Sequence, residues 1–131
     1  MSSVRVLVVD DQQPFRRAAV AVVGALQGFE VVGVAETGEE SVAEVARLRP
    51  DLTLMDVSLP GMSGLEAVRL IRADPALADL PVVLLTARAQ ESDVATGFES
   101  GADDYITKPF SPRELAKRVD SLLARESPDS H

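Results

Sequence analysis

Five short aliphatic runs recur along the chain, and each is followed by a longer segment, mostly with apolar residues at helical spacing. The first run, VRVLVV at residues 4–9, has almost no polar positions. A strand of that kind is typical of a parallel sheet that is covered on both faces. Strict alternation of such strands with helices predicts a single doubly wound α/β domain. The expected strands are residues 4–9, 30–35, 52–56, 81–86 and 104–107.

At three expected helix starts a sequence of the form Ser/Thr-x-x-Glu predicts the first residue, because the hydroxyl side chain can cap the first turn. These sequences start at Thr37, Ser63 and Ser111. We expect helices over residues 14–27, 37–49 and 63–73, over 91–100, and from 111 onward. Their apolar positions include Phe15, Ala18, Val22 and Leu26 in the first helix, Val42, Val45 and Ala46 in the second, and Leu115, Val119 and Leu122 in the last.

The composition limits the functions that the chain can have. The formal net charge is −8, whereas binding to nucleic-acid phosphates needs a basic face, so we expect no direct nucleic-acid binding by this chain. There is no Cys, which excludes a disulfide framework and a thiolate metal site. This suits a reducing cytoplasm, where we expect the protein to act. No apolar run is long enough to span a membrane.

Polar residues stand at the carboxyl ends of four expected strands. The first strand ends in Asp10-Asp11, the third in Asp56, the fourth in Thr86 and the fifth in Thr107-Lys108-Pro109. Ligands of open α/β sheets bind beyond the carboxyl ends of the strands. Three carboxylates, a hydroxyl and an ammonium group therefore meet at one edge if these four strands are neighbours.

Such a group of side chains predicts phosphoryl transfer. Three adjacent carboxylates cannot all stay ionised without a cation, and ligands that are all oxygen suit Mg²⁺. A carboxylate beside such a metal can act as a nucleophile and form an aspartyl phosphate. On this hypothesis Asp10 and Asp11 hold the metal, Asp56 accepts the phosphoryl group, and Thr86 and Lys108 stabilise the charge on its oxygens.

Each of these residues also has a simpler interpretation when it is taken alone. An Asp at a strand end is often a helix cap or a turn residue, and this applies to the Asp10-Asp11 pair and to Asp56. Thr86 suits a strand, and Lys108 could be a solvated charge. The joint placement of all five residues at strand ends favours the functional interpretation.

The motifs that contain these residues resemble the receiver domain of bacterial two-component response regulators. They are VLVVDD, LMDVSLPGMSG, VVLLTA and GADDYITKPF, and together they extend over nearly the whole chain. The resemblance implies a flavodoxin-like (βα)5 fold with strand order 2-1-3-4-5. The segment SGADDYITKPFSPRELAKRV is most similar to the winged-helix transcription-factor branch of the family.

The resemblance also implies a role for each residue of the acidic edge. Asp56 would accept phosphate from a histidine kinase, a phosphotransfer protein or a small phosphodonor. Asp11 would contact Mg²⁺ directly, Asp10 mainly through water, and Ser58 through its backbone carbonyl. Ser58 and Arg88 would border the phosphate and tune its lifetime, and Arg88 could shield or orient an attacking water.

Other residues would carry the signal away from the phosphate. Lys108 would pair with the phosphoryl group, and its bond to Pro109 would be cis, which is common only before proline. Thr86 would move to hydrogen-bond the phosphate, and Tyr105 would then rotate inward. That movement would change the face formed by the fourth helix, the fifth strand and the fifth helix. A half-buried strand aromatic is the simpler interpretation of Tyr105.

Winged-helix receivers dimerise through this face by three types of ion pair, so a phosphorylation-dependent homodimer is an expectation. Glu114 lacks its usual basic partner, because Val94 occupies that position. A solvated charged surface is an equally good interpretation, since exposed ion pairs contribute only about 0–1 kcal/mol each. The two retained pairs would be Asp104 with Arg118 and Asp103 with Arg125.

We therefore expect a receiver domain over residues 1–125, a polar tail over 126–131 and no output domain in this chain. It would catalyse its own phosphorylation and slow dephosphorylation, turn over no separate substrate, and act on a downstream protein partner or output domain. A phosphate-independent adaptor is the main alternative. An aspartate-dependent phosphatase would need Asp-x-Asp, whereas Gln12 follows Asp11 here. A flavin domain is disfavoured by the acidic first turn.

Overall fold

A computed structural model describes residues 3–86, 101–108 and 110–126 of the chain. The helix expected over residues 91–100, Arg88 and Pro109 lie outside this description. The described elements are β1 (Val4–Val9), α1 (Gln13–Ala25), β2 (Phe29–Ala35), α2 (Gly38–Leu48), β3 (Leu52–Asp56), α3 (Gly64–Ala73), β4 (Val82–Thr86), β5 (Asp104–Thr107) and α5 (Pro112–Glu126).

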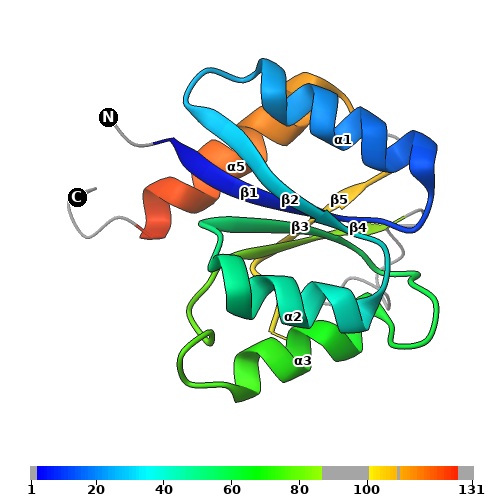
Figure 1. Ribbon diagram of the computed structural model, residues 1–131. Helices are drawn as coiled ribbons and strands as arrows, with labels where there is room; N and C mark the ends of the chain where they lie inside the picture. The colour runs from blue at the N-terminus through cyan, green and yellow to red at the C-terminus, as the bar shows by residue number, and fades with distance from the viewer. Residues whose placement is uncertain (1–2, 87–100, 109, 127–131) are drawn as a thin grey trace.

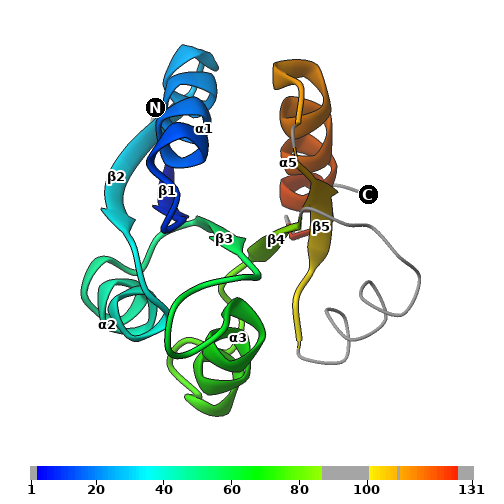
Figure 2. The same cartoon turned by 90° about the vertical axis from the view of Figure 1, so that its right-hand side faces the viewer.

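The strands form one parallel sheet in the order β2-β1-β3-β4-β5, which confirms the predicted topology (Figure 1). Val9 of β1 is in register with Met55 of β3, and Thr86 of β4 is in register with Thr107 of β5. The four strands expected to carry the site are therefore neighbours, and they end at the same edge of the sheet. Figure 2 shows this edge facing the viewer.

Helices cover both faces of the sheet, as the aliphatic strands predicted. Figures 1 and 2 show α1 and α5 on one face and α2 and α3 on the other. Each pair of helices packs against the strand side chains that point toward it, which gives one aliphatic core on each face of the sheet. The three central strands are consequently buried on both sides. Among the described helices, none is both long and apolar enough to cross a lipid bilayer.

The three predicted caps are present. In each, the hydroxyl oxygen accepts a hydrogen bond from the backbone N–H three residues later, which satisfies one free donor of the first turn. The donor–acceptor distances are 3.0 Å for Glu40 to Thr37, 3.2 Å for Glu66 to Ser63 and 3.0 Å for Glu114 to Ser111.

The predicted inward face of α1 was wrong by about one residue. The buried side chains of this helix are Ala19 and Val23, whereas Ala18 is exposed. The segment AAVAVVGA is apolar on every side, so its periodicity does not fix which positions face the sheet. The prediction for α5 was right, because Leu115, Val119 and Leu122 are all buried.

The prediction of the inward face of α2 was also partly wrong. Val45 is buried as expected, but Ala46 is exposed and Ser41 is buried. The Ser41 hydroxyl donates to the Gly38 carbonyl oxygen at 2.6 Å. A serine that satisfies its hydroxyl within its own helix can be buried at little cost, which a pattern of apolar residues does not reveal.

Gly64, the first residue of α3, lies directly against the backbone of the candidate phosphoacceptor. A β-carbon at this position would overlap with the carbonyl oxygen of Asp56. The Gly64 N–H also donates to the Val57 carbonyl oxygen at 2.9 Å. The end of β3 is therefore fixed by the start of α3, and only glycine leaves room for that contact.

Gly64→Ala should destabilise the protein by about 2 kcal/mol or more, because the new methyl group must displace the backbone that carries Asp56. Gly24→Ala is the matched control, because a β-carbon at Gly24 of α1 meets nothing within 4 Å. That variant should be stabilised by up to about 1 kcal/mol through helix propensity. Urea unfolding followed by circular dichroism measures both, and equal effects of the two substitutions would contradict the proposed contact.

Candidate functional site

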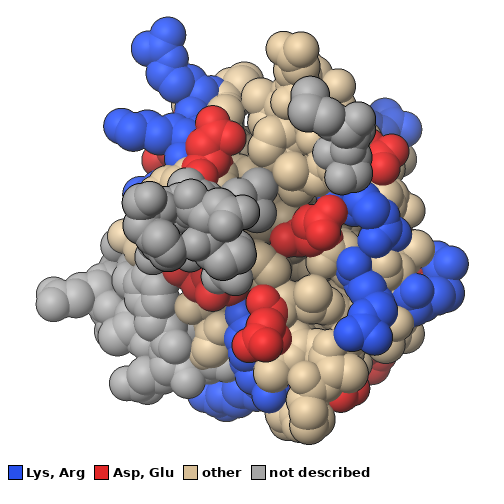
Figure 3. Space-filling model, turned by 90° about the vertical axis from the view of Figure 1, so that its left-hand side faces the viewer, with Lys and Arg blue, Asp and Glu red and all other residues tan. Residues whose placement is uncertain are grey.

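Three carboxylates lie together where β1 and β3 end. Asp10 and Asp56 follow Val9 and Met55, which are paired in register, so their side chains are neighbours. Asp11 is the next residue after Asp10. One carboxylate oxygen from each of the three lies within 4.8 Å of the others. Figure 3 shows the opposite end of the sheet, where basic and acidic side chains are interspersed.

Lys108 provides a positive charge that contacts two of these acids. Its Nζ lies 2.6 Å from Asp10 Oδ2 and 3.2 Å from Asp56 Oδ1. The side chains of Lys108, Asp10 and Asp56 are only 4%, 1% and 6% exposed. One buried ammonium group therefore contacts two of the three clustered carboxylates, and the four side chains together keep an excess of negative charge.

The turn that carries Asp10 and Asp11 is fixed by hydrogen bonds. Asp10 Oδ1 accepts a hydrogen bond from the Gln12 N–H at 2.9 Å, and the Asp10 carbonyl oxygen accepts one from Arg16 Nη1 at 2.9 Å. The same Nη1 lies 3.2 Å from Glu36 Oε1. Asp11, by contrast, is exposed. Its carboxylate is therefore accessible to a hydrated cation, while Asp10 is held from several sides.

The environment of Asp56 disfavours its charged form. Burial raises the pKa of the Asp56 carboxyl above its usual value, and the Asp10 carboxylate raises it further. The Lys108 ammonium and a backbone hydrogen bond from Ser58 lower that pKa and so oppose the rise. The rise therefore shows that Lys108 and Ser58 do not fully offset the effects of burial and of Asp10 on Asp56.

The donor set fits a hard divalent cation. Its side-chain ligands are all carboxylate oxygens, which Mg²⁺ prefers, and the excess negative charge is of the sign that a cation offsets. Asp10, Asp11 and Asp56 are the residues that could hold it.

Of the other predicted site residues, the structure describes Thr86, Ser58 and Tyr105. Thr86 ends β4 beside Thr107, and its carbonyl oxygen accepts the Lys108 N–H at 2.7 Å. Ser58 is exposed in the loop that follows Asp56. Tyr105 is half-buried in β5, and the Arg118 guanidinium carbon lies 5.5 Å from the centre of its ring.

Comparison with known proteins identifies the family. The family model of the response regulator receiver domain matches residues 6–120 of the sequence, which is most of the chain. This chain belongs to that family. Two-component signalling is therefore its functional class, as the sequence motifs predicted.

Curated relatives of this receiver include a transcriptional regulatory protein and a DNA-binding response regulator. It is 43% identical over 123 residues to the phosphate regulon transcriptional regulatory protein PhoB of Pseudomonas aeruginosa, covering 94% of this chain and 53% of that protein. It is 44% identical over 121 residues to the DNA-binding response regulator MtrA of Mycolicibacterium smegmatis, covering 92% and 51%. The chain spans about half the length of these relatives. Both confirm the predicted similarity to the winged-helix branch.

Solved structures agree with the fold. A putative response regulator from Chloroflexus aurantiacus has a TM-score of 0.89 at 37% identity, covering 95% of this receiver and all (100%) of that chain. The receiver domain of the sensor histidine kinase PA1611 from Pseudomonas aeruginosa has a TM-score of 0.84 at 30% identity, covering 93% and 98%. The latter was solved with a magnesium ion coordinated in its active site cleft.

The loop after Asp56 is anchored to α2 in a way that the sequence did not indicate. A β-carbon at Gly38 would overlap with the carbonyl oxygen of Met62. Glu39 Oε1 accepts the Met62 N–H at 3.3 Å. Together with the contact between Gly64 and Asp56, these interactions hold both ends of the loop that contains Ser58.

Phe15 also lies at the receiver site, and the sequence did not indicate it as a site residue. Its ring centre lies 4.3 Å from Lys108 Nζ, at the edge where the acids meet. The sequence indicated Phe15 only as an apolar position of α1. The signal that could have found it is its place in the first helical turn after the Asp pair, where a side chain can face the site.

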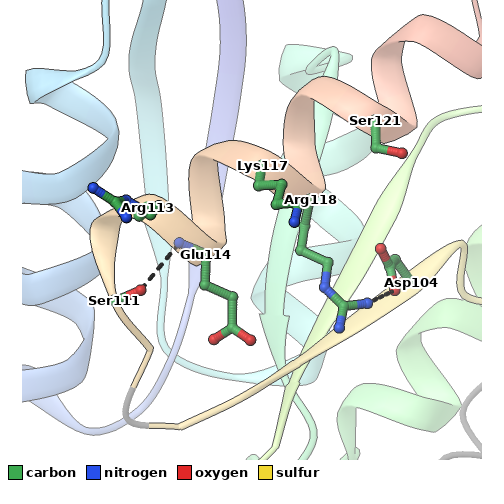
Figure 4. A pocket seen from close by; sticks show the side chains of 7 residues that line it. All are labelled: Asp104, Ser111, Arg113, Glu114, Lys117, Arg118 and Ser121. Carbon is green, nitrogen blue, oxygen red and sulfur yellow. Dashed lines mark hydrogen bonds and ion pairs between the residues drawn. The ribbon is translucent and has the colours of Figure 1, made fainter.

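The β5–α5 surface carries several charged groups that are already paired within the chain. Arg118 lies 2.9 Å from Asp104 Oδ1, and Arg72 lies 2.7 Å from Asp103 Oδ2, which also accepts the Val82 N–H at 2.8 Å. The side chain of Arg125 and all of Val94 lie outside the described residues. An open hollow of about 500 Å³ on this surface is lined by Asp104, Ser111, Arg113, Glu114, Lys117, Arg118 and Ser121 (Figure 4).

Asp56→Asn should stabilise the metal-free protein at pH 7 by about 1 kcal/mol, because it removes one of the crowded negative charges. The native state holds the Asp56 proton more tightly than the unfolded chain does, so wild-type stability rises as the pH falls through the raised pKa. The advantage of the variant should therefore shrink in that interval.

Urea unfolding at several pH values, with a chelator present, measures this difference. Asp120→Asn is the control, because Asp120 is exposed on α5 and its substitution changes the net charge equally. A destabilised Asp56→Asn at pH 7 would contradict the account.

Proposed function

We propose that this receiver is a phosphorylation-dependent switch in which Asp56 accepts a phosphoryl group. The observation that carries the proposal is the arrangement of the buried Asp56 carboxylate, which lies beside the Asp10-Asp11 pair and 3.2 Å from the Lys108 ammonium. In the transfer, an Asp56 carboxylate oxygen forms a bond to phosphorus as the bond from phosphorus to the donor nitrogen breaks. The donor histidine keeps the electron pair of that bond.

Mg²⁺ is the proposed cofactor, with Asp11 as a direct ligand, Asp10 acting mainly through water, and Asp56 and the Ser58 carbonyl oxygen completing the set. When bound, the ion would offset the carboxylate charges and attract the phosphoryl oxygens. The oxygen-only cluster and the magnesium ion in the cleft of the PA1611 receiver support this assignment.

Lys108 would stabilise the charge that develops on the phosphoryl oxygens. Its ammonium group is 3.2 Å from the Asp56 oxygen. It is therefore close enough to contact a phosphoryl group bound to that oxygen. Thr86 would donate its hydroxyl to the phosphate, and Ser58 and Arg88 would tune its lifetime. The bond from Lys108 to Pro109 remains a predicted cis bond.

The signal would leave the site through Tyr105 and the β5–α5 surface. A sensor histidine kinase or a phosphotransfer protein would supply the phosphoryl group, and a downstream partner or an output domain would read the altered surface. PhoB is named a transcriptional regulatory protein and MtrA a DNA-binding response regulator, which suggests an output that acts on DNA. A homodimer through this face would require Asp104 and Arg118 to exchange their pairing within the chain for pairing between chains.

The test is intact-mass spectrometry after addition of Mg²⁺ and phosphoramidate. The wild type should gain one phosphoryl group only with Mg²⁺, and Asp56→Asn should gain none. Asp120→Asn, the matched control on α5, should be phosphorylated like the wild type. If the wild type gains nothing in samples quenched within seconds, although calorimetry shows bound Mg²⁺, the adaptor function that needs no phosphate replaces this proposal.

A further inference from the structure

We propose that Phe15 is a positioning residue for Lys108, and that its aromatic face holds the ammonium group beside Asp56. The inference rests on the proposed function, because it assigns to Phe15 a part in phosphoryl transfer. It is carried by the contact between the two side chains, which come from α1 and from the end of β5.

The distance and the burial both support an energetically useful contact. Lys108 Nζ lies 4.3 Å from the ring centre, well inside the limit of about 6 Å for a cation–π interaction. The Lys108 side chain is 4% exposed, so little water competes for the ammonium. Such contacts are strongest where the cation is desolvated.

The remaining contacts of the ammonium show why the ring matters. Within the described part of the chain, Asp10 Oδ2 and Asp56 Oδ1 are the carboxylate oxygens in contact with it. Both carboxylates also belong to the cluster that would bind a cation, so both exchange partners during a phosphorylation cycle. The Phe15 ring carries no net charge and binds no metal. It is therefore the contact that stays constant while the acidic partners of Lys108 change.

The position of the ring is fixed by its neighbours along the chain. Pro14 lies in the first turn of α1, where its restricted backbone suits a helix start. Arg16, the next residue, donates to the Asp10 carbonyl oxygen at 2.9 Å and pairs with Glu36 at 3.2 Å. The first turn of α1 is thereby attached to the end of β1, which holds Phe15 over the site.

The chain offers a direct spectroscopic test, because it contains only two lysines, Lys108 and Lys117. In protein labelled with ¹³C-lysine, ring currents from Phe15 should shift the Lys108 ε-methylene protons upfield of those of the exposed Lys117. Phe15→Leu should move the Lys108 signals toward the Lys117 values. Phe29→Leu, at the start of β2, is the control and should leave both lysines unchanged.

The functional test uses phosphorylation rates with phosphoramidate and Mg²⁺. Phe15→Leu should lower the rate at saturating donor about fivefold, equivalent to about 1 kcal/mol. The half-saturating donor concentration should stay unchanged, because Lys108 acts on charge that develops during transfer. Replacing Phe15 with mono-, di- and trifluorophenylalanine should lower the rate in steps, since fluorine weakens the negative ring face at nearly constant shape.

Two results would overturn the proposal. One is a Phe15→Leu variant that melts like the wild type but leaves the Lys108 signals in place. The other is a trifluorophenylalanine variant that is phosphorylated as fast as the wild type. That result would show that the ring contributes only its shape. If the wild type is not phosphorylated at all, the proposed function fails, and the lysine signals still decide whether Phe15 holds Lys108.

Discussion

Repulsion among three carboxylates is the constraint on which the rest of this receiver depends. Asp10, Asp11 and Asp56 approach within 4.8 Å of one another, and Lys108 lies against two of them. The aliphatic sheet, closed by helices on both faces, keeps these charges together although they disfavour one another. Burial of Asp56 is the main cause of its raised pKa, and the neighbouring Asp10 carboxylate adds to it. A bound cation would offset this repulsion, and so would chemistry that removes the charge of Asp56.

The surface that would carry the signal is connected to the same framework. Arg72 of α3 donates to the carbonyl oxygens of Leu80 and Gly101 as well as to the Asp103 carboxylate. A single guanidinium group therefore joins α3 to the segments that precede β4 and β5. Because Asp103 and Asp104 already have partners within the chain, any assembly through this face has to compete with those contacts.

Local features of the sequence predicted local structure well, and contacts between distant elements less well. The aliphatic runs predicted the strands to within about a residue, and the strand ends predicted that Asp10, Asp56 and Lys108 lie together. The α1 face was misassigned because that helix is apolar all round. The contacts of Phe15 with Lys108 and of Gly64 with Asp56 depend on how a helix is placed over a strand end. No periodicity in the sequence encodes that placement.

The most direct test of the central claim is a calorimetric titration of Mg²⁺ into the wild type, Asp11→Asn and the control Asp120→Asn. Asp11 is exposed, so its substitution should remove charge and a ligand without disturbing the core. The account predicts that Asp11→Asn weakens Mg²⁺ binding at least about tenfold, or about 1.4 kcal/mol, while Asp120→Asn leaves it unchanged. Equal affinity in all three proteins would show that the carboxylate cluster does not bind the cation.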